Sequence, residues 1–373
     1  MDSASVSGEF TYRGDGRHRV LVAGPNKNYG GVEMVLARFM DALSGRLVFD
    51  TLAFDDLLQP EFYANGNHVI RLPKRGGHPV AYERAVRRFF KSRGHEYDAV
   101  WSNHNSFGNL DYLTHGKAAG IPVRVCHYHN TAILGSRIDG ILSHFNREKV
   151  PDVSTHLIAC SPEAGVFAYG DLPFDVVNNA FDIGSFQFSA LARRRVRASL
   201  GCEDSFVVGT VGRLAPQKNH RYLISLFPRI KKERRDARLV IVGAGELEEE
   251  LRRQVRNLDL EDEIVFTGER DDVSVLLNAF DVFVLPSHYE GLGVSLVEAQ
   301  ANGLPCIAST GVPVSARASY SVDFIRLDDE TEWVRAITHN DRSSFKPDKR
   351  RMSAFDIRVE SEKLGDILTG GCE

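Results

Sequence analysis

Two hydrophobic patterns alternate along the chain. Short apolar runs rich in β-branched residues lie at 18–25 and 96–103, and a segment with apolar residues at helical spacing, 30–44, follows the first of them. Because strands that alternate with helices are typical of βαβ units, this order predicts a parallel sheet with crossover helices. Two further strands are predicted at 121–130 and 155–162.

The same alternation begins again in the second half of the chain. Residues 175–189, which are rich in Asn, Asp, Gly and Ser, precede it and carry the expected linker. The sequence therefore predicts an α/β fold of two doubly wound, Rossmann-like domains that face a central cleft. The strands predicted in this half are 205–212, 237–243, 263–268, 281–287 and 304–309, and the helices are 220–233, 245–258 and 271–280.

Length and composition fit two soluble domains. The chain has 373 residues, 43% hydrophobic and 26% charged, and its formal net charge of −4 gives no general attraction to nucleic acid.

The five cysteines are scattered without a CxxC pair, so we expect free thiols in a reducing compartment. No apolar run reaches the ~20 residues of a membrane helix, and residues 1–17 lack the apolar core of a signal peptide. We therefore expect a cytoplasmic protein with a flexible N-terminal extension at 1–17.

The loop at 211–220 is the first candidate for a phosphate site. It leaves a predicted strand, carries Arg213 and Lys218, and enters a helix that Asn219 is expected to cap. Ligands of doubly wound sheets bind beyond the carboxyl ends of the strands, and two cations near a helix N-terminus suit a diphosphate. The alternative is a solvated basic loop.

Two glycine-bearing loops follow other strands. Gly30 and Gly31 open the predicted helix at 30–44 without the GK[ST] ending of a P-loop, so they form either a close backbone approach to a ligand or a tight turn. Gly243 belongs to a GxG fragment at 243–245. No acidic residue at a strand end ~20 positions on completes a dinucleotide fingerprint, and a nicotinamide cofactor is therefore not expected.

Glu290 and Glu298 flank a predicted helix start near Gly293 or Val294. Eight residues of helix would span ~12 Å, roughly the reach from the ribose to the sugar of a nucleotide-diphosphate sugar. Each carboxylate would accept hydrogen bonds from vicinal hydroxyls, and the helix N-terminus between them would face the diphosphate. The alternative is a helix start that carries acids because its dipole favours them.

Two histidines stand at the end of the predicted strand 121–130. His127 and His129 share one side of an extended chain, because side chains alternate along a strand. One would contact a sugar hydroxyl or a phosphate, and the other would pack in the core. A metal pair lacks a third ligand nearby in the sequence.

Taken together, these segments resemble glycosyltransferase family 4, the retaining sugar-nucleotide transferases of the GT-B fold, over nearly the whole chain. The most specific part is 281–309, which carries the family's E-x7-E pattern between an apolar-Pro-Ser strand end and Gly-Leu-Pro. The segment 211–219 matches the family's diphosphate loop. Residues 170–182 look like its Pro-Asn-Gly-acid linker, but Asn-Asn-Ala replaces Asn-Gly there, which leaves the hinge conformation open.

The resemblance assigns a role to each predicted domain. Residues 18–177 would form the acceptor domain, 178–350 the donor domain, and 351–373 a helical segment that packs back on the first domain. Segments 98–106 and 124–131 resemble members that build bacterial exopolysaccharide or capsule, although the first is poorer in histidine than their pattern. The expected reaction moves a sugar from a UDP-linked donor to a sugar or a polyprenyl-diphosphate-linked glycan.

The resemblance also assigns residues to the donor. Arg213 and Lys218 would bind its diphosphate, Glu290 would hold the transferred sugar, and Glu298 would bind the ribose. In such enzymes a donor phosphate oxygen takes the acceptor proton, so no protein nucleophile, metal or other cofactor is expected. Electrostatic stabilisation of the leaving diphosphate then supplies most of the catalysis. The further donor residues implied are Gly30, Gly31, Gly243, Arg270, Gly291, Leu292, Gly293 and Val294.

On the first domain the resemblance implies one site histidine. His129 is preferred over His127 as the residue that touches the transferred sugar or the β-phosphate, and Asn130 lies beside both on the acceptor side. The candidate catalytic residues are therefore His129, Arg213, Lys218 and Glu290.

Residues 71–95 carry eight basic residues against a single acid, Glu83. A basic amphipathic helix with aromatic residues suits an anionic membrane surface, so this segment would dock the protein peripherally on the inner face of the plasma membrane. The alternative is a solvated helix that covers the sheet and buries Val86, Phe89 and Phe90.

Two other functions agree with the predicted fold. Nucleotide-sugar 2-epimerases convert a UDP-sugar without an acceptor, but they do not usually carry the stretch at 287–309. A non-catalytic nucleotide-sugar-binding protein would be expected to have lost Arg213, Lys218 or Glu290, and the sequence keeps all three.

Overall fold

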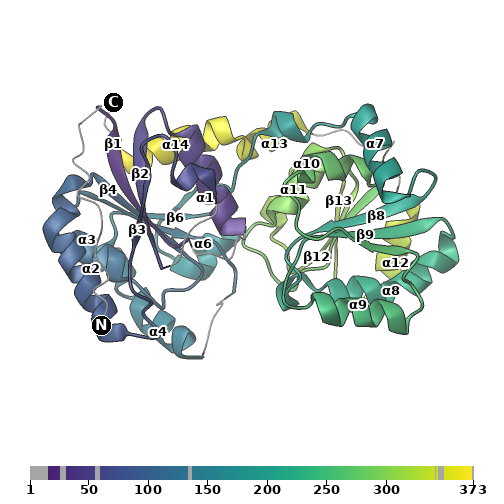
Figure 1. The fold of residues 1–373 in the computed structure, drawn as a ribbon, viewed down its shortest axis with the longest axis horizontal. Helices are drawn as coiled ribbons and strands as arrows, with labels where there is room; N and C mark the ends of the chain where they lie inside the picture. Colours follow the sequence, from purple (N-terminus) through teal and green to yellow (C-terminus); the bar gives the residue numbers. More distant parts are fainter. Residues whose placement is uncertain are drawn as a thin grey trace. The chain divides into compact units, whose positions relative to one another are not determined.

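The computed structural model describes residues 16–25, 31–54, 59–132, 137–340, 342 and 348–371 (Figure 1). The chain forms two compact units, and the first of them contains both the N-terminal half and the C-terminal end of the sequence. The units are Met1–Phe181 with Ile357–Glu373, and Asp182–Asp356.

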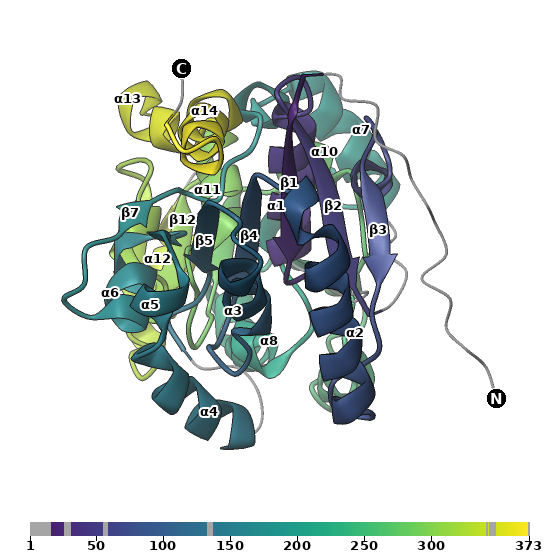
Figure 2. The same ribbon diagram turned by 90° about the vertical axis from the view of Figure 1, so that its left-hand side faces the viewer.

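The first unit is built on a seven-stranded parallel sheet in the order β3-β2-β1-β4-β5-β6-β7 (Figure 2). The strand order reverses between β1 and β4, which is the position where open α/β sheets bind ligands. The register aligns the carboxyl ends of two strands, because Asn103 of β4 pairs with His127 of β5. The strands are β1 (His18–Ala23), β2 (Leu47–Ala53), β3 (His68–Arg71), β4 (Ala99–His104), β5 (Val123–Tyr128), β6 (His156–Ala159) and β7 (Asp175–Val176).

The last helix, α14, belongs to the first unit although it follows the second in sequence. Ile357 N donates to Phe181 O at 3.0 Å, and Asn178 N donates to the Glu360 carboxylate at 2.6 Å. The helices of this unit are α1 (Gly31–Ala42), α2 (Pro79–Arg93), α3 (Asp111–Ala118), α4 (Arg137–Arg147), α5 (Val150–Val153), α6 (Pro162–Tyr169) and α14 (Ile357–Leu368), with 3-10 turns η1 (Pro60–Phe62) and η2 (Gly94–Glu96).

The second unit contains a six-stranded parallel sheet in the order β10-β9-β8-β11-β12-β13. Its order reverses between β8 and β11. The strands are β8 (Phe206–Val211), β9 (Ala237–Val242), β10 (Ile264–Phe266), β11 (Val282–Leu285), β12 (Cys306–Ser309) and β13 (Val322–Ile325). The helices are α7 (Ala190–Leu200), α8 (His220–Glu233), α9 (Glu248–Asn257), α10 (Val273–Leu276), α11 (Val294–Ala301), α12 (Glu330–His339) and α13 (Lys349–Met352). Its 3-10 turns are η3 (Ile183–Phe186), η4 (Pro216–Lys218), η5 (Leu277–Ala279), η6 (Val314–Ala316) and η8 (Ser353–Phe355).

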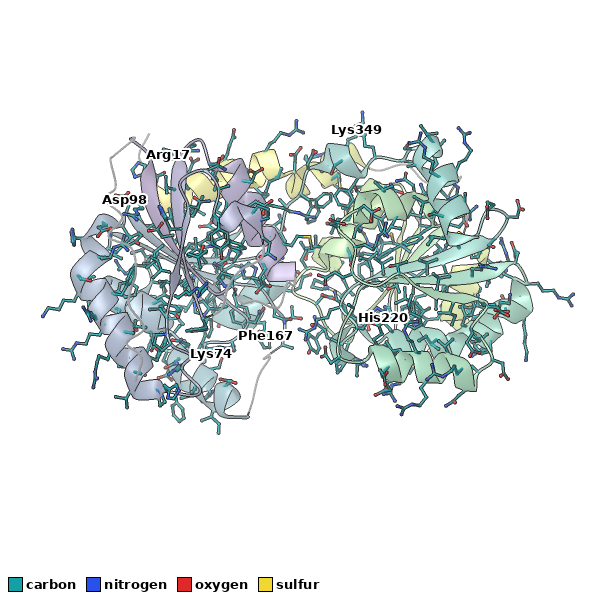
Figure 3. The ribbon with its side chains drawn as sticks, viewed as in Figure 1. Arg17, Lys74, Asp98, Phe167, His220 and Lys349 are labelled. Atoms are coloured by element: carbon teal, nitrogen blue, oxygen red, sulfur yellow. The ribbon has the colours of Figure 1, made fainter. Side chains whose placement is uncertain are left out.

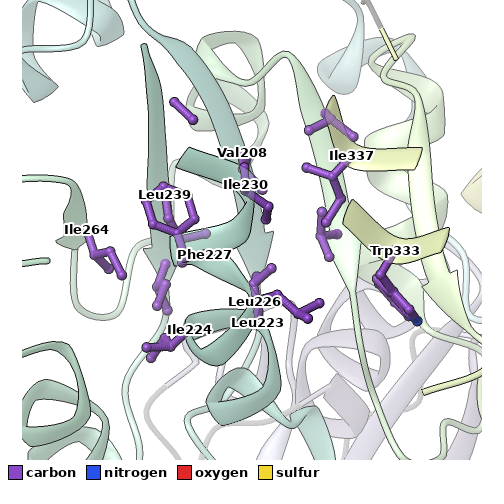
Figure 4. Packing of buried hydrophobic residues seen from close by; sticks show 14 of the residues in the cluster. Val208, Leu223, Ile224, Leu226, Phe227, Ile230, Leu239, Ile264, Trp333 and Ile337 are labelled. Carbon is purple, nitrogen blue, oxygen red and sulfur yellow. The ribbon is translucent and has the colours of Figure 1, made fainter. Parts of the chain in front are cut away.

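The core of the second unit fixes the strand ends that carry the candidate site. Helix α8 places Leu223, Phe227 and Ile230 on one buried face, since residues three and four apart lie on the same side of a helix (Figure 4). The fully buried Trp333 of α12 packs edge-on against Tyr222 of α8, with ring centroids 5.6 Å apart. Truncating such buried side chains typically costs about 2–5 kcal/mol, so the loops at this edge rest on a firmly packed layer.

The predicted fold class is confirmed, since both sheets are parallel and alternate with helices. The sequence interpretation missed β2, β3, β7 and β13, and it joined α10 and η5 into one longer helix at 271–280. It placed the start and end of α8 correctly.

The segment 71–95 runs from the last residue of β3 through a loop and α2 into the turn η2. Val86, Phe89 and Phe90 are buried, so the aromatic residues face the protein and the solvent-facing side of the helix is basic. For these three residues the sheet-covering alternative is correct. Within the described part of the chain, no helix is both long and apolar enough to span a bilayer.

Candidate functional site

Two loops meet at the switch point of the second unit, one after β8 and one after β11. Three hydrogen bonds join them: His288 N to Gln217 O at 2.8 Å, Gln217 Nε2 to Tyr289 O at 3.0 Å, and Asn219 Nδ2 to Pro286 O at 3.2 Å. The predicted cations and the first predicted carboxylate belong to these loops. The backbone therefore brings together residues that are more than 70 positions apart in sequence.

Glu290 lies at the centre of this loop pair and is buried. Its Oε1 accepts hydrogen bonds from Lys218 Nζ at 2.6 Å and from Ser287 Oγ at 2.7 Å, and its Oε2 faces Gln217 Nε2 at 3.4 Å. The Lys218 side chain is only 17% exposed, which excludes the solvated-loop alternative for this residue. Burying a carboxylate without a partner costs free energy, and the ion pair with Lys218 and the hydrogen bonds offset that cost. The same contacts hold Glu290 and Lys218 in one geometry.

The helix behind Glu290 begins where the sequence predicted. Helix α11 starts at Val294, and Gly293 before it has φ 85°, a left-handed conformation that suits glycine. Leu292 is buried, and Glu298 is buried one turn inside the helix. Only the last part of the span from Glu290 to Glu298 is helical, so the ~12 Å spacing expected from eight helical residues does not apply.

Asn219 occupies the N-cap position of α8 as predicted, but its side chain does not cap the helix. It has φ 53°, its side chain makes no capping bond, and its amide reaches Pro286 O across the loop pair. The 3-10 turn η4 delivers the chain into α8 through a left-handed residue, a conformation that Asn tolerates better than most residues. The Asn219 backbone therefore begins the helix, while its side chain joins the two loops.

The other predicted cations lie on the surface. Arg213 Nη2 contacts Glu246 Oε2 at 3.0 Å, and both side chains are about half exposed. Arg270 pairs with Asp272 at 2.7 Å on the next loop. The carboxylate partners of these two cations are Glu246 and Asp272, whereas Lys218 pairs with Glu290, so the described contacts join only part of the predicted donor residues.

Gly243 has a structural reason to be glycine. Its φ is 133°, and a Cβ atom placed there would lie 2.2 Å from the carbonyl oxygen of Gly212. Its own N–H donates to Gly268 O at 2.9 Å. The loops after β8, β9 and β10 therefore pack backbone against backbone, and this alone requires a residue without a side chain.

At the switch point of the first unit, two histidines pack against each other. The rings of His127 and His129 have centroids 3.9 Å apart, and both side chains are buried. Trp101 Nε1 donates to His127 Nδ1 at 3.2 Å, so His127 packs in the core. His129 Nε2 bonds to Asn103 Oδ1 at 2.8 Å.

The tautomer of His129 follows from Asn103. The amide nitrogen of Asn103 donates to the carbonyls of Ala23 and Trp101, so its oxygen faces His129 and accepts from Nε2–H. Nδ1 of His129 is then a hydrogen-bond acceptor, and it is buried; the side chain of Asn179, which is also buried, interacts with the same ring. Beside these histidines, Asn130 is also buried.

A third histidine, His104 at the end of β4, belongs to the same cluster, and sequence reasoning did not select it. Burial lowers the pKa of His104 to about 4 and that of His129 to about 3, and it holds the pKa of His127 well below its usual range. The three rings are therefore neutral near pH 7 and act through hydrogen bonds, not through charge. The signal was present in the sequence, since His104 ends its strand as His129 follows the end of β5.

Two remaining predictions concern the helix α1 and metal binding. Gly31 is the first residue of α1, and Gly30 lies outside the described residues. Among the residues that the structure describes, no group of three or more His, Cys, Asp or Glu side chains is placed to hold a metal ion.

Comparison with known proteins shows the family to which the chain belongs. The sequence profile of the family described as glycosyl transferases group 1 matches residues 192–318, which include Lys218 and Glu290. EpsF of Bacillus subtilis, a protein classed with the glycosyltransferases, is 32% identical over 307 residues, and the match covers 79% of each chain. The chain belongs to the group 1 glycosyltransferases.

Further relatives of this glycosyltransferase include a galactosyltransferase of Escherichia coli. Its name is UDP-Gal:alpha-D-GlcNAc-diphosphoundecaprenol alpha-1,3-galactosyltransferase, and it is 29% identical over 290 residues, which cover 74% of this chain and 70% of the relative.

The solved structures support the fold of the glycosyltransferase. HepE of Anabaena, crystallised in complex with UDP, matches 95% of this chain and 100% of its own with a TM-score of 0.73 and 20% identity. WaaG, described as a glycosyltransferase involved in lipopolysaccharide biosynthesis, matches 94% of this chain and 100% of its own with a TM-score of 0.65 and 17% identity. The two-unit α/β fold is therefore the GT-B fold.

Proposed function

We propose that this group 1 glycosyltransferase is a retaining member of family 4. It transfers a sugar from a UDP-sugar to a sugar or a lipid-linked glycan during polysaccharide or glycoconjugate biosynthesis. The observation that carries the proposal is the buried Lys218–Glu290 pair, held by two loops at the switch point in front of α11. The UDP and UDP-glucose complexes of HepE and the UDP-Gal donor in the name of the Escherichia coli relative support a UDP-linked donor.

Lys218 and Glu290 divide the donor between them in this proposal. Lys218 binds a diphosphate oxygen and offsets the charge that develops as UDP leaves, while Glu290 Oε2 accepts a hydroxyl hydrogen of the transferred sugar. Oε1 accepts hydrogen bonds from Lys218 and Ser287, and Oε2, which Gln217 Nε2 faces at 3.4 Å, is the oxygen proposed to accept the sugar hydroxyl. Because Glu290 contacts both Lys218 and the transferred sugar, correct placement of the sugar also fixes Lys218 on the diphosphate.

Arg213 adds a second charge to the diphosphate. Its exposed pair with Glu246 contributes little to stability, about 0.2–1 kcal/mol for pairs of this type, so a phosphate displaces Glu246 easily. The N-terminus of α11, with Gly291 to Val294, adds the positive end of the helix dipole. Glu298 binds the ribose, and Arg270 lies beside the base.

The proposed mechanism needs no protein nucleophile. A donor phosphate oxygen takes the proton of the acceptor hydroxyl on the same face of the sugar, and the anomeric configuration is retained. Preorganised charges on the leaving diphosphate supply most of the rate enhancement. Metal independence remains a prediction of this mechanism.

His129 is the proposed site histidine of the first unit. Its acceptor atom Nδ1 suits a sugar hydroxyl, which donates, better than a phosphate oxygen, which accepts. Of the two contacts predicted for His129, the transferred sugar and the β-phosphate, we therefore propose the sugar. Gly30, Gly31 and Asn130 keep their predicted places in the donor and acceptor sites as part of this proposal.

The test is transfer activity in substituted proteins. Lys218→Ala and Glu290→Ala are each expected to lower transfer and donor hydrolysis by a factor on the order of 10²–10³, the usual loss of one transition-state contact. Lys232→Ala, an exposed lysine of α8, is the matched control and keeps full activity.

Either single change also leaves a buried charge without its partner, which can lower stability by about 3–5 kcal/mol. The double variant Lys218→Ala/Glu290→Ala removes both charges and separates lost activity from lost folding. Near-normal transfer in a folded single variant would contradict the proposal. A UDP-sugar that is epimerised without an acceptor would point to the 2-epimerase instead.

A further inference from the structure

A third loop of the second unit, which follows β12, contacts the loop that carries Glu290. Strands β11 and β12 are parallel neighbours, with Leu285 paired to Ala308, so both end at the same edge of the sheet. The loop after β8, which carries Lys218 and enters α8 at His220, belongs to this edge as well (Figure 3). No residue of the loop after β12 was predicted to take part in the site.

Hydrogen bonds join the loops after β11 and β12 in a closed ring. Ser309 Oγ donates to Ser287 O and accepts from Gly311 N at 3.2 Å. Glu290 N donates to Gly311 O at 3.1 Å, and Ser287 Oγ donates to Glu290 Oε1 at 2.7 Å. The same set of contacts therefore holds both the backbone of Glu290 and its carboxylate.

Ser309 links the two loops through a single atom. A hydroxyl oxygen both donates and accepts, so Ser309 Oγ can join the carbonyl of Ser287 to the N–H of Gly311. Ser309 and Ser287 are fully buried, so water does not compete for these bonds. Alanine at 309 would remove the link and leave the rest of the ring open.

Gly311 allows the two loops to meet backbone against backbone. A Cβ atom at this position would lie 2.1 Å from His288 O. Gly311 does not have a positive φ, so the close approach requires a glycine here and the backbone conformation does not. Because His288 stands two residues before Glu290, a side chain at 311 would displace the backbone that carries the carboxylate.

The loop after β12 has a shape of its own before it meets Glu290. Val312 N donates to Ser309 O at 3.1 Å, which closes a tight turn directly after the strand. Val312 is buried, and a Cβ atom at Gly293 would lie 3.2 Å from its Cγ1, so the turn packs against the start of α11. The loop thus transmits the position of β12 and α11 to the Glu290 backbone.

We propose that Ser309 and Gly311 are positioning residues for the transferred sugar and that they act through Glu290. This inference rests on the proposed contact between Glu290 Oε2 and a sugar hydroxyl. Lys218 holds the carboxylate from the loop after β8, whereas the ring holds it from the loop after β12. A misplacement of about 1 Å in a positioning group can cost on the order of 100-fold in rate. Since the loop that carries Lys218 lies outside the ring, binding of the diphosphate does not depend on Ser309.

The experiment measures two dissociation constants of the full chain by calorimetry, one for UDP and one for the tighter binder of UDP-glucose and UDP-galactose. Ser309→Ala is expected to weaken the UDP-sugar on the order of tenfold and to leave UDP within about twofold. Ser321→Ala is the matched control and keeps both constants. It removes a buried serine hydroxyl of the same unit that contacts Ser319 Oγ and Leu304 O, outside the ring.

A double-mutant cycle shows whether Ser309 acts through Glu290. If it does, Glu290→Gln/Ser309→Ala binds the UDP-sugar no more weakly than Glu290→Gln alone, because the two changes remove the same contact. Ser309→Thr keeps the hydroxyl and is expected to recover most of the affinity that alanine loses. If Ser309→Ala does not fold, Ser309→Cys takes its place, since it keeps the side-chain volume with only a weak donor.

Gly311→Ala tests the backbone contact of the same ring. It is expected to weaken the UDP-sugar more than UDP, because the added methyl pushes the Glu290 loop. Gly140→Ala is its control, since nothing lies within 4 Å of a Cβ atom there, and it keeps both constants.

The outcomes separate this inference from the proposed function. Additive losses in the double variant, or equal weakening of UDP and UDP-sugar by Ser309→Ala, would overturn the positioning role. If Glu290→Gln weakened the UDP-sugar and Ser309→Ala did not, the role of the loop would fail and the proposed function would stand. If neither variant changed the ratio of the two constants, the sugar contact of Glu290 itself would fail.

Discussion

At the scale of single residues, Glu290 depends on neighbours that the donor motif does not name. Ser287 and Gln217 contact different carboxylate oxygens, and Gln217 also reaches Tyr289 O in the same loop. These two neutral side chains orient the Glu290 carboxylate and do not themselves neutralise charge on the donor. They are positioning residues for the proposed sugar contact.

Gln217→Ala and Ser287→Ala are predicted to lower donor hydrolysis by about 10- to 100-fold, because each loses a hydrogen bond to a charged group. Binding of UDP alone should change little, since Lys218 remains. Steady-state kinetics and UDP titrations measure the two effects. Equal losses in UDP binding and in hydrolysis would show that the loops had collapsed, and would count against positioning.

A second prediction at this scale concerns Gly243. Gly243→Ala is expected to lower the free energy of unfolding by more than Gly201→Ala, although both glycines have positive φ. The added methyl at 243 would collide with Gly212 O, whereas at 201 nothing lies within 4 Å. The strain at a positive φ alone is on the order of 1–3 kcal/mol. Thermal melting of the two variants measures the difference in stability. Equal shifts in Tm would refute the close packing of the loops around Gly243.

At the scale of helices and strands, α14 ties the end of the chain to the first unit. Leu364 and Leu368 are fully buried, and the carboxylate of Glu360 accepts from Asn178 N. The helix is therefore part of the core of a unit whose other elements are far away in sequence.

Leu364→Ala is predicted to destabilise the first unit by about 2–5 kcal/mol, the usual cost of a truncated core leucine. Val359→Ala on the same helix is the control, because Val359 is half exposed. Chemical denaturation monitored separately for each unit measures the change. If both variants unfolded alike, α14 would not be packed as described.

The elements differ in how far the sequence could predict them. The boundaries of α8 and the start of α11 were predictable, because apolar spacing and a glycine mark them. Strand β2 was missed because its apolar pattern contains Asp50, which is fully buried. The structure pairs Asp50 with Arg19 Nη2 at 2.5 Å and Tyr97 Oη at 2.7 Å, partners that lie on other strands or after a helix.

In the candidate site, too, local sequence patterns could not predict contacts between distant segments. Lys218 and Glu290 were each predicted, but not their direct contact, because it depends on the crossover that places β11 beside β8. His104 was missed although it ends its strand, since the register of β4 with β5, which brings it to the histidine cluster, is not visible in the sequence.

At the scale of the whole molecule, the buried histidines make stability depend on pH. The folded-state pKa values of His104, His129 and His220 are lowered by burial to about 4, 3 and 3. The unfolded chain binds their protons near pH 6.5, so it takes up protons before the folded chain does. Stability is therefore fully present above about pH 6.5 and falls as the pH is lowered toward 4.

The predicted loss between pH 7 and pH 5 is a few kcal/mol, at about 1.4 kcal/mol for each pKa unit. Urea denaturation at both pH values measures it, and both units should respond, because His220 lies in the second and the other two in the first. Greater stability at pH 5 than at pH 7 would contradict neutral, buried rings.

The most direct test of the central claim is the ratio of two dissociation constants. Calorimetry would compare UDP with the UDP-sugar that the enzyme hydrolyses, for the wild type and for Glu290→Gln. The account predicts that Glu290→Gln weakens the UDP-sugar by about tenfold or more and leaves UDP nearly unchanged, because the lost carboxylate faces the sugar. Equal weakening of both ligands, or no change in either, would contradict the assignment of Glu290 to the transferred sugar.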